Sequence, residues 1–379
     1  MVCGSDTIDW SDVLVAREAV AALAYHLEGG GWHRGSNSGQ SLLAMLLGRI
    51  LDNMYSIYEG SSLHNPSLAR RLKSMASLAR GKKATLPVDY IYALLGVCSD
   101  LPGHTGHKDF VLQPDYEIPV EDVYLQTARY LLTKEGANAL AWKTGLRQDS
   151  NLQLPSWVPD WTSTNVEKPL DLPAMYFEQP LYSACGRNQN FVWHTTGDVN
   201  GHTLSLLAFC IDTVTTIPVN ASTVRSDTLA LYGAFLKSNV GNITADLSDV
   251  IWRVPIADQG LCHVGVTPSR SRVPQALPGA FHESIAHASS SETLAYLRDF
   301  EFISHGRKAF ITQAGRAGLG PESAAVGDGV YIIQGVSVPT ILREAGNGQY
   351  RMVGEAYVYG VMDGEAMEGD PKLEWVEIV

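Results

Sequence analysis

The chain has 379 residues, of which 45% are hydrophobic and 18% are charged. This composition allows a large buried core and excludes an intrinsically disordered protein. Lys and Arg number 28 against 40 Asp and Glu, which gives a formal net charge of -12. Such a charge repels a phosphate backbone, so we expect no nucleic-acid partner.

The cysteines and the N-terminus favour a reducing compartment. The five thiols are odd in number and form no Cys-x-x-Cys pair, which is typical of free cysteines: Cys3, Cys98, Cys185, Cys210 and Cys262. The N-terminus lacks the basic start and apolar core of a secretory signal, and no apolar run is long enough to span a membrane. We therefore expect a cytoplasmic protein without a membrane partner.

The first part of the chain, residues 1–150, is predicted to be helical. Asp9 can cap a helix whose apolar face runs from Trp10 to Leu27, and Leu42 to Tyr55 keep helical spacing over several turns. Further helices are predicted over residues 66–78, 88–97 and 119–132.

Residues 151–379 are predicted to be rich in strands. From about Phe191 the chain turns to β-branched and aromatic runs, as in residues 203–217 and 329–334. Helical insertions are expected over residues 226–237 and 291–302, and the Pro-rich stretches 155–180 and 268–278 are expected to be ordered loops. The fold class predicted is α+β, with a helical N-terminal layer packed on a mainly antiparallel β part in one compact unit.

No metal or cofactor site is expected. His104 and His107 share a Gly-rich loop but lack further ligands at fixed spacing, and His282, Glu283 and His287 do not have zincin spacing. A glycine-rich segment at residues 29–35 follows a predicted helix, where a phosphate loop follows a strand. There is no Gly-x-Ser-x-Gly elbow, so no nucleophile is assigned.

Two aromatic blocks are the remaining candidates for a binding site. Trp157 and Trp161 flank a Pro-Asp turn, which favours a packed hinge between the two layers over the wall of a ligand site. Strand alternation would place Tyr357 and Tyr359 on one face, ahead of an Asp-Gly turn that indicates a structural role.

Four blocks of sequence, taken in order, carry a family resemblance. They are residues 3–10, the Tyr-Ala-Leu-Leu-Gly and Pro-Asp-Tyr blocks at 92–96 and 114–116, residues 154–161, and a C-terminal signature at 318–321 and 353–365. These blocks resemble the region downstream of the N-terminal domain in fungal heterokaryon-incompatibility (HET) proteins. The defining Ser-Tyr-x-Trp-Gly and Asp-x-x-Cys-Ile blocks of that N-terminal domain have no counterpart, and Tyr90 and Tyr359 replace the family's frequent Arg and His.

Three hypotheses for function follow from the resemblance, the missing effector domain and the lack of cofactor or nucleophile motifs. We expect either that Met1 marks a truncation or that the chain is a scaffold that lost the effector domain. A scaffold could serve fungal specialised metabolism as a cofactor-free cyclase that confines a small apolar, terpenoid-like substrate for intramolecular cycloaddition (a Diels–Alderase). Its hydrogen-bond donors and substrate-binding residues would be Trp157, Arg343, Tyr357 and Tyr359.

The alternative is a non-enzymatic protein of allorecognition or immunity, which senses a ligand or partner for a separate effector. A functionless relic is a third hypothesis, and the intact signature disfavours it.

Overall fold

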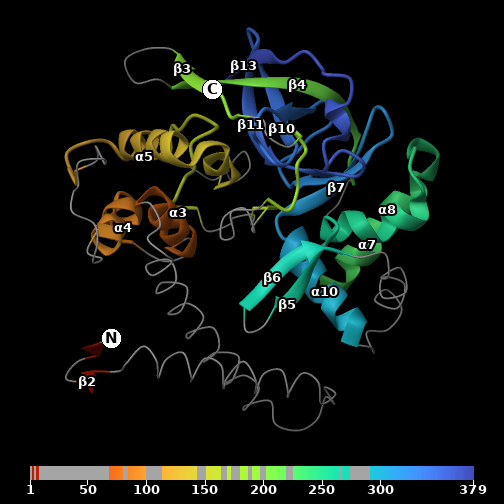
Figure 1. The fold of residues 1–379 in the computed structure, drawn as a ribbon, viewed down its shortest axis with the longest axis horizontal. Helices are drawn as coiled ribbons and strands as arrows, with labels where there is room; N and C mark the ends of the chain where they lie inside the picture. The colour runs from red at the N-terminus through yellow and green to blue at the C-terminus, as the bar shows by residue number, and fades with distance from the viewer. Residues whose placement is uncertain are drawn as a thin grey trace. The chain divides into compact units, whose positions relative to one another are not determined.

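We describe the protein from a computed structural model (Figure 1). The structure describes residues 2–3, 6–7, 68–79, 84–99, 113–142, 151–163, 169–171, 180–186, 190–196, 202–218, 225–264, 267–273 and 291–379. The helices predicted around Trp10 to Leu27 and Leu42 to Tyr55 lie outside these residues.

The chain divides into two compact units. The first comprises Met1–Ala79 and Tyr92–Asp109, and the second comprises Arg80–Ile91 and Phe110–Val379. In the first, strands β1 (Val2–Cys3) and β2 (Asp6–Thr7) pair antiparallel, and α3 spans Leu68–Ala79. Helix α4, Asp89–Ser99, crosses the boundary between the units. The predicted division near residue 150 stays a prediction.

Helix α5, Val120–Glu135, opens the larger part of the second unit. Pro119 precedes it, and acidic side chains in its first turn complement the positive end of the helix dipole. The helix ends at Gly136, whose φ of 60° suits glycine, before the 3-10 helix η2, Gly136–Trp142. Its buried face includes Tyr124, whose hydroxyl donates to the Pro87 carbonyl at 2.7 Å.

Five strands of the second unit close into a β-barrel. They are β4 (Thr203–Thr216), β9 (Gly329–Ile333), β10 (Thr340–Gly346), β11 (Gln349–Glu355) and β13 (Glu374–Ile378). The pairing runs β4–β13–β11–β10–β9 and returns to β4, and among these pairs only β11–β13 is parallel. The long β4 closes the ring because it pairs with β13 at residues 204–208 and with β9 at residues 208–213.

The far end of β4 continues into a second group of strands. Val214 and Thr216 pair with β7 (Arg307–Thr312), which pairs with β8 (Ala317–Pro321), and β8 pairs with β12 (Tyr357–Val358). On the other side of β4 lies β3, Trp193–Thr196. One apolar cluster joins the barrel to this group, and its fully buried members include Val214, Phe310, Val330, Ile341, Val353 and Val358.

A long insert separates β4 from β7. It contains α7 (Arg225–Ser238), η3 (Val240–Asn242), α8 (Leu247–Arg253), η4 (Val254–Ile256), the hairpin β5 (Gln259–Val264) and β6 (Thr267–Arg272), and α10 (Ser291–Ser304). In Figure 1 these helices gather at the β7 end of the barrel, and the hairpin projects from them.

The α+β class predicted from the sequence is confirmed, with a largely antiparallel sheet in the C-terminal part. Helices α3, α4, α5, α7 and α10 and strands β4 and β9 match predicted elements within a few residues. The loop predicted over residues 268–278 was wrong for residues 268–272, which belong to β6, Thr267–Arg272. In the part of the chain that the structure describes, no helix is long and apolar enough to cross a membrane.

Candidate functional site

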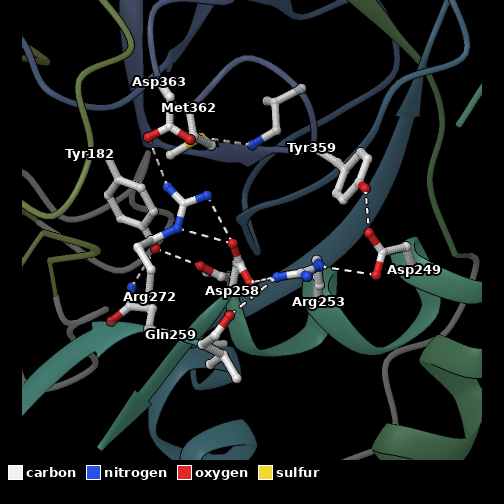
Figure 2. Close-up of polar contacts among 12 residues, drawn as sticks. Tyr182, Asp249, Arg253, Asp258, Gln259, Arg272, Tyr359, Met362 and Asp363 are labelled. Carbon is white, nitrogen blue, oxygen red and sulfur yellow. Dashed lines mark hydrogen bonds and ion pairs between the residues drawn. The ribbon is translucent and has the colours of Figure 1, made fainter. Parts of the chain in front are cut away.

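Alternating charges from the insert and from the turn after β12 meet in one row. Asp249, Arg253, Asp258, Arg272 and Asp363 form consecutive ion pairs, and we call these five residues the ion-pair row (Figure 2). The Asp258 side chain at its centre is buried, at 6% exposed, whereas Asp363 at one end is 55% exposed.

Local sequence places the first three members. The Asp246 carboxylate accepts from Ser248 N at 2.9 Å and caps α8, and the helix then presents Asp249 and Arg253 one turn apart. After η4 the chain turns sharply, because Ala257 and Asp258 have φ values of 49° and 53°. This left-handed turn points Asp258 back at Arg253 and starts β5 at the next residue.

The two arginines share the Asp258 carboxylate. Arg253 Nη1 donates to Oδ1, while Arg272 Nε and Nη2 lie 3.0 and 2.8 Å from Oδ2. Outward from this centre, Arg253 Nε donates to Asp249 Oδ1 at 3.1 Å and Arg272 Nη1 donates to Asp363 Oδ1 at 3.1 Å. Each arginine thus bridges two carboxylates, an arrangement that favours charge-assisted hydrogen bonds.

Tyr182 and Gln259 extend the row into the core. The Tyr182 hydroxyl donates to the Ala257 carbonyl at 2.5 Å and accepts from Gln259 Nε2 at 2.7 Å. The same amide nitrogen donates to the Leu170 carbonyl at 2.8 Å, and the Arg272 guanidinium lies 5.1 Å from the Tyr182 ring centroid. Gln259 is fully buried, and its Oε1 has no hydrogen-bond partner among the described residues.

The tyrosines of the site stay protonated at neutral pH. Burial raises the pKa of Tyr182 and of Tyr357 far above the usual value. Burial and the hydrogen bond to Asp249 raise the pKa of Tyr359 to about 12. Burial would also raise the pKa of Asp249, but the hydrogen bonds from Tyr359 and Arg253 outweigh it, so this pKa is lowered. The Tyr359 hydroxyl therefore acts as a neutral donor to the Asp249 carboxylate, 2.8 Å away.

The four residues proposed from the sequence as substrate-binding have different partners in the structure. Tyr357 and Tyr359 both lie in the electrostatic field of Arg253 and Asp258. Trp157 is buried and donates its indole N–H to the His202 carbonyl at 2.9 Å. The strand that carries Tyr357 ends at Val358, so it is shorter than alternation through Tyr359 requires.

Arg343 belongs to a different ion pair. Its Nε and Nη2 donate to the two carboxylate oxygens of buried Asp328 at 2.7 and 2.8 Å, and Nη2 also donates to the Ser323 carbonyl at 2.8 Å. This bidentate geometry fixes the guanidinium to the β8–β9 connection.

Sequence reasoning missed the centre of the row. Arg253, Asp258 and Arg272 belong to no motif, and the only local signal is the helical spacing of Asp249 and Arg253. Among the described residues no group of three or more His, Cys, Asp or Glu could hold a metal ion. The histidines at 104, 107, 282 and 287 lie outside these residues.

A second buried carboxylate provides a test of acid sensitivity. Asp212 accepts from Arg316 Nη1 at 2.8 Å and from the backbone of Thr213 and Ala314. Burial opposes ionisation, but the hydrogen bonds from Thr312, from the backbone and from Arg316 outweigh it, and they lower the pKa of Asp212.

We expect the free energy of unfolding to fall in acid in part because of Asp212. A lowered folded-state pKa stabilises the protein fully above the unfolded value of about 3.9, and this contribution is lost as pH falls through the folded pKa. In Asp212→Asn the free energy of unfolding should therefore fall less steeply as pH is lowered from about 5 to about 2, as measured by urea unfolding at each pH. Arg316→Gln should shift the slope in the same direction, whereas curves parallel to wild type would contradict the assignment.

The sequence of the chain is similar to a known domain family and to a known protein. Residues 280–376 match the family model of the Het-6 beta-barrel domain. The chain is also 24% identical, over 348 residues, to heterokaryon incompatibility protein 6, OR allele, of Neurospora crassa. This match covers 73% of the chain and 48% of the relative, so the chain spans about half the length of the curated protein it matches. No solved structure matches the chain significantly.

Proposed function

Because the chain is a relative of fungal heterokaryon-incompatibility proteins, we propose that it is a non-enzymatic recognition protein of allorecognition. In this proposal it senses a ligand or partner and passes the signal to a separate effector. The observation that carries the proposal is the Het-6 beta-barrel match over residues 280–376, a range that contains β9, β10 and β11 of the closed barrel.

The contacts of the candidate site support a scaffold. The four ion pairs of the row bind its charged side chains to one another. Tyr359 also donates a hydrogen bond to Asp249, the first member of the row. Such a row fixes the insert to the turn after β12 at a defined position. A fixed insert beside a barrel is a suitable framework for recognising a partner by shape and charge.

The cofactor-free cycloaddition stays a prediction from the sequence. It requires donors that polarise a substrate carbonyl. Trp157 instead donates to His202 and Arg343 to Asp328 and Ser323. Because these two donors are already hydrogen-bonded within the chain, we favour the recognition function over the cycloaddition.

Expression in Neurospora crassa tests the proposed function. The chain would be fused to a HET effector domain, and the growth rate of heterokaryons with partner strains would be compared with that of an unfused effector. We expect slower growth with the fusion, and only with particular partner strains. Equal growth with all strains, at matched accumulation of folded protein, would contradict the proposal.

Two variants make this experiment specific to the core cluster that joins the barrel to β7. Phe310→Ala removes a fully buried ring from the core cluster and should abolish the effect. Lys372→Gln breaks only an exposed ion pair, with side chains 85% and 68% exposed, and should leave the effect unchanged.

A further inference from the structure

The β5–β6 hairpin is joined to the rest of the second unit at its open end. Its register runs from Val264↔Thr267 at one end to Gln259↔Arg272 at the other, which we call the root. Within the described strands, β5 and β6 pair only with each other. A two-stranded ribbon is marginally stable alone, so the hairpin depends on contacts with the rest of the second unit, and those of the root are described below.

The root of the hairpin is fixed on the side that faces the core. Gln259 donates to Leu170 and to Tyr182, and it follows Asp258 directly in the chain. The Val273 N–H donates to the Asp258 carbonyl at 3.2 Å, immediately after β6. Gly260, the next residue of β5, lies close to Asp299 of α10, because a Cβ there would be 3.7 Å from Asp299 Oδ2. These inner contacts attach the root to the core.

The outer side of the root has a different kind of contact. Arg272 reaches from the end of β6 to Asp363, which lies in the turn after β12. Figure 2 shows the guanidinium between Asp258 on one side and Asp363 on the other. The Arg272–Asp363 pair therefore joins the hairpin directly to the barrel-side turn.

Burial decides which of these contacts can open. The Asp258 side chain is 6% exposed, Arg272 is 31% exposed and Asp363 is 55% exposed. Exposed ion pairs are weak and are screened by salt, whereas buried pairs resist screening. The Arg272–Asp363 pair is thus the weaker of the two ion pairs at the root. The Arg272–Asp258 pair holds Arg272 when the Arg272–Asp363 pair breaks.

We propose that the Arg272–Asp363 ion pair is a latch that fixes the β5–β6 hairpin to the turn after β12. When the latch opens, Arg272 keeps its bonds to Asp258, and the root of the hairpin is held by its inner contacts alone. The opened state frees one face of the Arg272 guanidinium and the Asp363 carboxylate at the same place. This device belongs to the fold and holds whether or not the chain acts in allorecognition.

Hydrogen–deuterium exchange of the whole chain tests the latch. Asp363→Ala removes the outer carboxylate, while the backbone N–H of residue 363 keeps its bond to Glu365 Oε2. We expect amide exchange in Gln259–Val264 and Thr267–Arg272 to become about 3- to 10-fold faster, since a weak exposed pair is lost. Exchange in β9 and β10 should stay at the wild-type rate.

Salt provides an independent measurement on the same protein. Raising sodium chloride to about 1 M shortens the screening length to about 3 Å and should accelerate hairpin exchange in wild type. The same change of salt should have no effect on the hairpin in Asp363→Ala. Lys372→Gln, which breaks another exposed pair, is the matched control and should leave hairpin exchange unchanged.

The outcomes distinguish a latch from a general loss of stability. Unchanged hairpin exchange in Asp363→Ala would overturn the proposal, and so would equal acceleration in the hairpin and in β9–β10. Because Asp363 is largely exposed, the variant is expected to fold, and its near-ultraviolet circular dichroism verifies this directly.

Discussion

Replacing Asp258 with Asn is expected to lower the free energy of unfolding by about 3 kcal/mol. The substitution removes the charge that Arg253 and Arg272 share, and it leaves two guanidinium groups that are 13% and 31% exposed without that partner. Asn tolerates the left-handed backbone at this position, where φ is 53°, so the charge is the main change. Urea unfolding at neutral pH measures the loss.

A matched control is present in the same chain. Asp370 also has a left-handed backbone, with φ of 52°, but its side chain is exposed. Asp370→Asn should change the free energy of unfolding by less than about 0.5 kcal/mol. If the two variants were equally stable, the ion-pair row would contribute nothing beyond a surface pair.

Gly318→Ala is the second substitution expected to have a large effect. An ideal Cβ on Gly318 would lie 2.3 Å from Phe310 Cζ and 2.7 Å from the Tyr357 carbonyl oxygen. The Phe310 ring is fully buried and cannot move away without disturbing the core cluster. Overpacking of this kind costs about 1–3 kcal/mol, and we expect the upper end because the carbonyl belongs to the paired strand β12.

Gly241 and Phe310 supply the controls for this prediction. A Cβ on Gly241 meets nothing within 4 Å, so Gly241→Ala should leave stability unchanged or raise it by up to about 1 kcal/mol. In a Phe310→Leu background, the additional cost of Gly318→Ala should shrink, because part of the ring is absent. Thermal unfolding of wild type, Gly318→Ala, Phe310→Leu and the double variant measures this coupling, and additive effects would contradict the proposed clash.

The sequence predicted helices better than it predicted sheet closure. Helices such as α5 follow from apolar spacing within one segment, and β4 follows from its β-branched run. The barrel depends on pairs such as β4 with β13, which join residues 204–208 to residues 374–378. No local pattern encodes such a pair. Strand β6 was missed because Pro268 disfavours a strand in a propensity argument.

The candidate site was predictable only in part. Tyr357 and Tyr359 stand out as aromatic residues in a recognisable block, and the structure places both near the ion-pair row. Trp157 and Arg343 were equally good donors by chemistry, but their acceptors, the His202 carbonyl and the Asp328 carboxylate, are distant in sequence. The sequence alone does not show which hydrogen-bond donors are bonded to acceptors within the folded chain.

The double pairing of β4 decides where an independently folding piece of this chain could start. The region that matches the Het-6 beta-barrel domain spans residues 280–376, whereas β4 spans Thr203–Thr216. A fragment cut at residue 280 would leave β9 and β13 with open edges where β4 had joined them. Open edges invite pairing between molecules, so such a fragment would aggregate. The smallest soluble piece therefore begins before Thr203 and carries the whole insert with it.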